Sequence, residues 1–239
     1  MLEIKNLKVN RTRKNILNGI NLSIKGGETH ILMGPNGSGK STLANALMGN
    51  PSYEVFDGEI LLDGKSLLNL SPNKRASAGL FLAFQYPVEI EGVPMKSFLR
   101  TVLKELEKPL ENFEEELRKN LELLKIGKDI IERSLNFGFS GGERKKSEIL
   151  QLALFSPKYA ILDETDSGLD ISALRTVAEG ITVIKKRNPK LGVLIITHNP
   201  KILKYIKVDG VHLMLKGKIV RSGDIKLVKE VEKRGYYKL

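Results

Sequence analysis

The chain has 239 residues, of which 41% are hydrophobic and 28% charged, and a globular protein of this size buries roughly 70% of its unfolded surface. No apolar run approaches the ~18 residues of a membrane span, and no signal peptide precedes the first strand, so we expect a cytoplasmic protein without direct membrane insertion. The absence of cysteine and the wide spacing of the three histidines exclude disulfides, thiolate catalysis and clustered zinc or iron–sulfur ligands. Any metal must therefore be held by oxygen ligands.

The chain is basic, with 39 Lys+Arg against 28 Asp+Glu and a formal net charge of +11. Such an excess is compatible with nucleic acid, an acidic partner or polyanionic ligands. Most of the lysines are scattered singly with few aromatic residues among them, whereas a groove for single-stranded nucleic acid places stacking surfaces beside its charges. This pattern favours an ordinary solvated surface, and we expect no nucleic-acid partner.

The first part of the chain has the short or alternating apolar segments that predict strands, at residues 2–7, 20–24, 31–33 and 59–63. From about residue 94 to 156 the apolar residues instead recur at three and four positions, which is typical of amphipathic helices. We therefore expect a helical insertion there.

The remainder of the chain alternates between the two kinds of element. Apolar runs at 159–162 and 193–196 predict central parallel strands covered on both faces, with a helix at 172–187 between them. A hairpin at 211–223 and a last helix at 225–234 complete the prediction, which describes an α/β protein.

A phosphate-binding loop follows the strand at 31–33. Its residues satisfy G-x-x-x-x-G-K-[ST] directly before a predicted helix at 42–48 and comprise Gly34, Pro35, Asn36, Gly37, Ser38, Gly39, Lys40 and Ser41, with Thr42 next. Glycines let backbone N–H groups converge on a phosphate at the helix start, Lys40 reaches the β- and γ-phosphates, and Ser41 offers a hydroxyl to Mg²⁺.

Two carboxylates, Asp163 and Glu164, follow the apolar strand at 160–162. A core strand that runs into an acidic turn is common, so the pattern alone is weak evidence. Beside a phosphate loop, however, Asp163 is placed to hold Mg²⁺ and Glu164 to polarise a water molecule.

The segment Ser140-Gly141-Gly142-Glu143 predicts a capping box at the start of a helix that runs to about 155. Two glycines in a first turn weaken a helix, so we infer that exposed backbone is needed there. Exposed N–H groups at a helix start suit an anion.

The order of these motifs along the chain resembles that of the ATP-binding cassette (ABC) family. The order is the phosphate loop, Gln85, the helical insertion, Ser140-Gly141-Gly142, Asp163-Glu164, Asp170 and His198. The resemblance implies a P-loop cassette with a mixed-sheet core, 1–87 and 157–239, into which a helical subdomain of about 88–156 is inserted. It also implies an ATPase that uses ATP and Mg²⁺ and forms a homodimer on ATP binding.

Site roles come with the same resemblance. Gln85 senses the metal and the water, Glu164 is the general base, His198 contacts the γ-phosphate, and Asp170 lies in a loop that crosses the dimer. Residues 140–143 contact the ATP that is bound by the second copy of the protein.

Within the family, four segments resemble the SufC ATPases of the Suf iron–sulfur cluster assembly machinery: 83–90, 137–143, 163–170, and 223–224 with 235–236. Transporter cassettes commonly have Pro-Thr in place of Thr165-Asp166, Ala in place of Gly168 and Gln in place of Glu143. The resemblance implies an ATPase that drives conformational change in a Suf-type scaffold protein, SufB-like or SufD-like. Alternatives are the ATP-binding subunit of a membrane transporter and a DNA-associated cassette, for whose additional domains 239 residues leave no room.

The sequence leaves alternatives for adenine recognition and for the segment 86–93. Residues 1–52 contain no aromatic side chain to stack on adenine, so Arg11, Arg13 or Val9 would have to cover the base. Residues 86–93 are rich in apolar side chains, but Pro87, Gly92 and Pro94 exclude regular helix, which predicts an ordered surface loop. This loop either docks a partner or packs under the helices.

Overall fold

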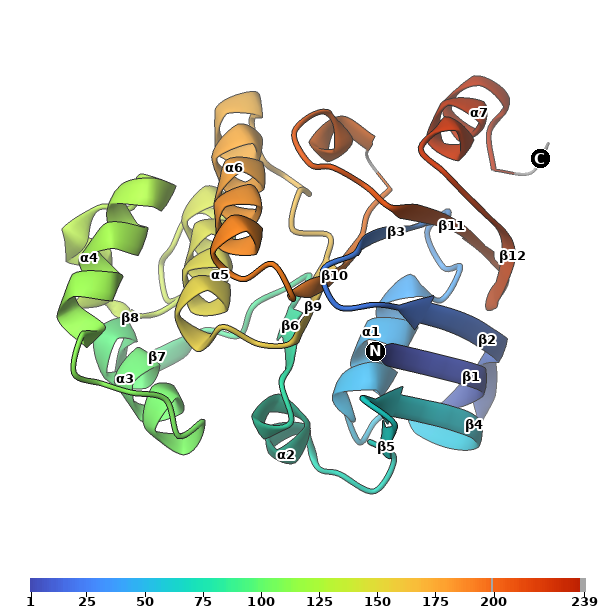
Figure 1. Cartoon of the computed structure of the whole chain (residues 1–239), viewed down its shortest axis with the longest axis horizontal. Coiled ribbons are helices and arrows are strands. Elements are labelled where there is room, and N and C mark those ends of the chain that lie inside the picture. Colours follow the sequence, from blue (N-terminus) through green and yellow to red (C-terminus); the bar gives the residue numbers. More distant parts are fainter. Residues whose placement is uncertain (199, 237–239) are drawn as a thin grey trace.

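The computed structural model describes residues 1–198 and 200–236 (Figure 1). The strands are β1 (Leu2–Arg11), β2 (Lys14–Ile24), β3 (Thr29–Met33), β4 (Glu54–Leu62), β5 (Lys65–Ser66), β6 (Leu80–Ala83), β7 (Ile90–Pro94), β8 (Ser134–Leu135), β9 (Tyr159–Asp163), β10 (Gly192–Ile196), β11 (Gly210–Leu215) and β12 (Lys218–Gly223). The helices are α1 (Lys40–Met48), α2 (Pro72–Ser77), α3 (Met95–Glu105), α4 (Phe113–Leu124), α5 (Gly141–Phe155), α6 (Ile171–Arg187) and α7 (Lys226–Arg234), with short 3-10 helices η1 (Lys128–Ile131) and η2 (Pro200–Lys204).

A six-stranded sheet of order β12-β11-β3-β10-β9-β6 forms the centre, parallel except for the hairpin strand β12. Alternate residues of a strand reach opposite faces. On β10, Val193 and Ile195 join the core beneath the helices, whereas Leu194 and Ile196 join the core around α1. The strand is apolar throughout because both faces are covered, and β9 follows the same pattern. The two central parallel strands predicted at 159–162 and 193–196 are therefore confirmed.

A second, antiparallel sheet of order β2-β1-β4-β5 packs against α1 on the far side from the helices (Figure 1). Its strand β4 begins at Glu54, earlier than the predicted range of 59–63. Gly58, with φ of +92°, lies where the pairing of β1 and β4 shifts, and a Cβ there would lie 2.5 Å from the carbonyl oxygen of Asn6. This bulge interrupts the alternation, which explains why the sequence pattern shows only the second half of the strand.

Helices α3, α4 and α5 gather at the opposite end of the molecule (Figure 1). These three helices account for the helical periodicity predicted at 94–156. Helix α6 packs against α4 and α5, and α5 also contacts β6 of the central sheet. None of the helices in the described part of the chain combines the length and hydropathy needed to cross a membrane.

The prediction of a loop over 86–93 is wrong at its end, because Ile90–Pro94 forms β7 and pairs with β8. The pairing register shifts between Ile90 and Pro94, and Gly92 in between has φ of +80°. Proline and glycine exclude helix here, as predicted, but they permit a short irregular strand.

Candidate active site

The loop between β3 and α1 has the backbone of a phosphate cradle. Gly37 and Gly39 have φ of +79° and +108°, values that side-chain-bearing residues rarely adopt, and a Cβ at Gly39 would lie 2.8 Å from Leu17. Helix α1 begins at Lys40 without a side-chain cap, so the N–H groups of its first turn have no side-chain acceptor. Such a helix start binds phosphate.

Lys40 is buried at the centre of this loop. Its Nζ donates to the carbonyl oxygens of Gly34 at 2.8 Å and Pro35 at 3.1 Å. Burial lowers the pKa of Lys40, and the nearby carboxylates of Glu164 and Asp163 oppose that change. The side chain thus brings a positive charge to the place where a phosphate would lie.

Asp163 ends β9 beside Ser41. Burial raises the pKa of Asp163 to about 6, although a hydrogen bond with Ser41 acts in the opposite direction. One carboxylate oxygen, Oδ1, is buried and has no hydrogen-bond partner among the residues described. An unpaired carboxylate oxygen next to a serine hydroxyl is a donor set that fits Mg²⁺. The described residues contain no group of three His, Cys, Asp or Glu side chains that could hold a metal ion.

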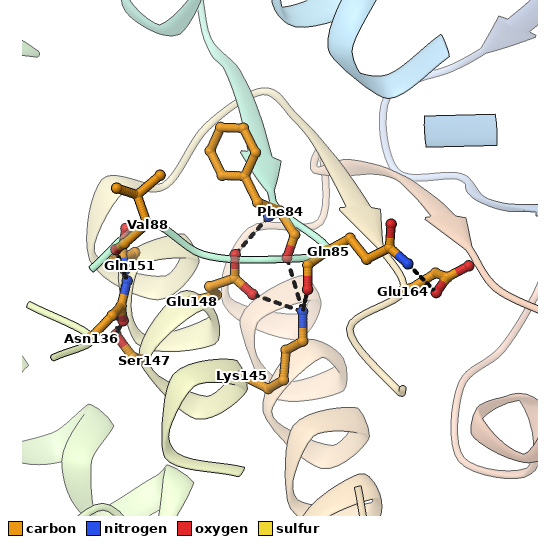
Figure 2. A network of polar contacts seen from close by, with 9 residues as sticks. All are labelled: Phe84, Gln85, Val88, Asn136, Lys145, Ser147, Glu148, Gln151 and Glu164. Carbon is orange, nitrogen blue, oxygen red and sulfur yellow. Dashed lines mark hydrogen bonds and ion pairs between the residues drawn. The ribbon is translucent and has the colours of Figure 1, made fainter. Parts of the chain in front are cut away.

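The carboxylate of Glu164 contacts two other predicted site residues, Gln85 and His198. Its Oε2 accepts a hydrogen bond of 2.8 Å from Nε2 of Gln85 (Figure 2). Its Oε1 lies 3.3 Å from Nδ1 of His198. The three residues follow β6, β9 and β10, which are neighbours in the parallel sheet. The structure therefore brings together the three side chains that the sequence named as catalytic.

The backbone of Glu164 is strained. Its φ is +50°, in the left-handed region that costs of order 1–3 kcal/mol for a residue other than glycine. A hydrogen bond of 2.9 Å from its N–H to the carbonyl oxygen of Ile196 holds this conformation. In this conformation the chain leaves the strand direction at Glu164, and the carboxylate contacts Gln85 and His198.

A cleft of about 320 Å³ opens over the phosphate loop and reaches the hairpin of β1 and β2. Its lining includes Arg11, whose guanidinium carbon lies 5.1 Å from the centre of the Tyr53 ring. Val9 is fully buried between the sheets, so the suggestion that it covers the base is wrong. Ile16 lines the cleft but was missed, because the sequence offers no signal that β2 turns this residue toward the loop.

Helix α5 begins at the predicted capping box. The N–H of Glu143 donates to Oγ of Ser140 at 3.2 Å, and the N–H of Ser140 donates to Oε2 of Glu143 at 2.7 Å. A Cβ on Gly141 would meet no atom within 4 Å, and one on Gly142 would only touch Ala173. Residues 140–143 are not among those lining the cleft of Lys40, so this helix start is open to a ligand from elsewhere.

Asp170 also lies outside that cleft. Its Oδ1 accepts a hydrogen bond of 2.8 Å from the N–H of Ala173 and caps helix α6. The next residue, Ile171, is 72% exposed, which is unusual for a large apolar side chain at a helix start. The first turn of α6 therefore presents an exposed apolar side chain that the sequence did not single out.

The ABC transporter family model matches residues 17–167. The chain is 50% identical to vegetative protein 296 of Bacillus subtilis, over 98% of this chain and 91% of that protein. It is 48% identical to the probable ATP-dependent transporter SufC of Escherichia coli, over 99% of this chain and 97% of that protein.

Two solved structures share the fold. One is the ATP-binding subunit of an ABC transporter, with a TM-score of 0.83 at 24% identity over 98% of this chain and 93% of the other. The second is a dimeric ATP-binding cassette in a post-hydrolysis state with ADP and phosphate, with a TM-score of 0.80 at 19% identity over 94% and 99%. The family match and the two relatives at 50% and 48% identity show that the chain belongs to the ABC ATPase family, as an enzyme that hydrolyses ATP and is similar to the protein named SufC.

Proposed function

We propose that this ATPase uses Glu164 as its general base and drives conformational change in a Suf-type scaffold complex during iron–sulfur cluster assembly. The observation that carries the catalytic part is the convergence of Gln85 and His198 on the Glu164 carboxylate, at the sheet edge that also holds the phosphate loop. The partner is inferred from the similarity to proteins named SufC.

The chemistry is the transfer of the terminal phosphoryl group of ATP to water. Lys40 and the backbone of residues 34–42 bind the phosphates, and Glu164 removes a proton from the attacking water as the bond to ADP breaks. Gln85 orients the Glu164 carboxylate, and His198 contacts the γ-phosphate. When bound by Ser41, Asp163 and Gln85, Mg²⁺ would offset the negative charge of the phosphates.

Two copies form the complete site in this proposal. Ser140 and Gly142 address the ATP that the second copy holds, and Asp170 with Ile171 lies between the copies. The support is positional, because the helix start at 140–143 is open and lies outside the cleft of its own phosphate loop. Such an interface is isologous and encloses two nucleotides.

The scaffold would dock at the segment after Gln85. Tyr86 and Val88 are 82% and 67% exposed, which argues against packing under the helices for these two side chains. An apolar groove of about 650 Å³ includes Phe84, two residues before Tyr86, and is also lined by Phe98 and Phe155. We propose that residues of about 88–156 act as a helical subdomain inserted in the nucleotide-binding core, and that this surface lies where the two parts meet.

Affinity capture from the native cell extract tests the partner. We expect the tagged wild-type chain to retain a SufB-like or SufD-like scaffold from the cytoplasm, with ATP present and absent. The relatives named as transporters make an ATP-binding subunit of a membrane transporter the second candidate. Recovery of an integral membrane protein instead of a scaffold would replace the Suf proposal by that one.

A further inference from the structure

Two charged residues in the second and third turns of α5 are buried. Lys145 and Glu148 are 5% and 3% exposed, and Nζ of Lys145 lies 3.4 Å from Oε2 of Glu148. Burial raises the pKa of Glu148 to about 7, while the charge of Lys145 opposes this change. Burying an ion pair rarely stabilises a fold more than apolar side chains would, so the pair requires another explanation.

Both side chains bind the backbone on either side of the Gln85 nitrogen. Oε1 of Glu148 accepts from the N–H of Phe84 at 2.6 Å, and Nζ of Lys145 donates to the carbonyl oxygens of Phe84 at 2.9 Å and Gln85 at 3.1 Å (Figure 2). These backbone groups lie beyond Ala83, where β6 ends, so the sheet no longer holds them. The α5 pair therefore fixes the path of the chain at Gln85.

From this anchored backbone, the Gln85 side chain extends to Glu164 (Figure 2). A continuous set of contacts thus runs from α5, through the Gln85 peptide groups, to the carboxylate proposed as the general base. We propose that Lys145 and Glu148 are positioning residues for ATP hydrolysis, which set Gln85 against Glu164 and transmit displacements of α5 to that carboxylate. The inference rests on the roles proposed above for Gln85 and Glu164.

Ser147 supplies the matched control. It lies between the two charged residues in the sequence and is fully buried. Its hydroxyl, however, donates to Oδ1 of Asn136 at 3.4 Å, and Asn136 donates to the carbonyl oxygen of Val88 (Figure 2). Ser147→Ala therefore removes a buried polar group from the same turn of α5 without touching the backbone of residues 84 and 85.

The experiment measures kcat and the Kd for ATP in Glu148→Leu and Lys145→Met, alone and combined with Gln85→Ala. Because small misplacements of catalytic groups cost up to about a hundredfold, we expect each variant to lower kcat by about ten- to a hundredfold. The Kd should change less than about threefold, since the phosphate loop is untouched. On the Gln85→Ala background neither variant should lower kcat further, and Ser147→Ala should retain the wild-type kcat.

Additive losses on the Gln85→Ala background, or an equal loss in Ser147→Ala, would show that the pair acts only on stability and would overturn the inference. An unchanged kcat in Glu148→Leu, which removes the acceptor for the Phe84 N–H at a similar side-chain volume, would overturn it too, even if Lys145→Met does not fold. Wild-type hydrolysis in Gln85→Ala and in Glu164→Gln would instead remove the proposed catalytic roles themselves.

Discussion

Gln85 and Glu164, 79 positions apart in the chain, are joined by a hydrogen bond of 2.8 Å. They follow β6 and β9, which pair in parallel, so both residues emerge at the same edge of the sheet. The contact therefore follows from the strand order, and the path of the chain after β6 determines whether Gln85 can reach Glu164.

Adenine recognition is expected to depend on Arg11. Its guanidinium lies over Tyr53 and lines the cleft, so its other face can cover the base. A cation–π contact contributes about 0.5–2 kcal/mol, and Arg11→Ala should raise the Kd for ATP by roughly 2- to 30-fold. Arg13→Ala is the control, because it removes one positive charge from the adjacent hairpin turn without removing Arg11. Equal weakening in both variants, measured by calorimetry, would rule out a specific contact.

Much of this site could be predicted from the sequence because its chemistry is local. The phosphate loop, the capping box of Ser140 and Glu143, and the carboxylates after β9 each depend on residues a few positions apart. Gln85 and His198, which reach Glu164 from distant segments, were named through the family resemblance and not from a local pattern. Lys145 and Glu148 have the i, i+3 spacing of an ordinary surface pair, and only the packing of α5 against the end of β6 shows that they are buried.

Dimerisation is expected to require ATP and the open helix start. The hydrolysis-deficient Glu164→Gln variant should elute as a dimer with ATP and as a monomer without it. Adding Gly142→Asp should abolish the dimer, because the new carboxylate would face the phosphates of the second copy. Within its own chain, a Cβ at this position meets nothing closer than 3.9 Å, so the fold should survive. A dimer that persists in the double variant would contradict an ATP site shared between copies.

Partner docking is expected to need the exposed segment after Gln85. Replacing Tyr86 and Ile90 by Ser should weaken scaffold capture while leaving ATP binding and thermal stability unchanged, since these side chains are exposed. Val220→Ser, a change at another exposed apolar residue on β12, serves as the control. Unchanged capture combined with a melting temperature lowered by several degrees would show that the segment is part of the core.

The stability of the fold should decrease in acid through His212. Its Nε2 lies 2.9 Å from Nδ1 of His30, which also faces Glu28, and its Nδ1 lies 2.7 Å from Oγ of Ser222. Burial first, and the neighbouring His30 second, lower the pKa of His212 from 6.5 to about 4.

The unfolded chain consequently binds this proton more readily than the folded chain. The stabilisation from neutral His212 is complete above pH 6.5 and is lost as the pH falls toward 4, a loss of about 3 kcal/mol at most. His212→Gln should show a smaller decrease in the free energy of unfolding between pH 7 and pH 4 than the wild type. Urea denaturation at each pH measures this free energy. Identical pH profiles for the variant and the wild type would exclude His212 as the source.

The general base is tested most directly by ATP hydrolysis in the Glu164→Gln variant under saturating Mg²⁺ and ATP. The amide keeps the shape of the carboxylate but cannot take the proton of water, so kcat should fall by ~10²–10⁴-fold while the Kd for ATP stays within a few-fold of wild type. Glu114→Gln, at an exposed carboxylate on α4, should retain full activity. Hydrolysis by Glu164→Gln within a few-fold of the wild-type rate would show that Glu164 is not the base.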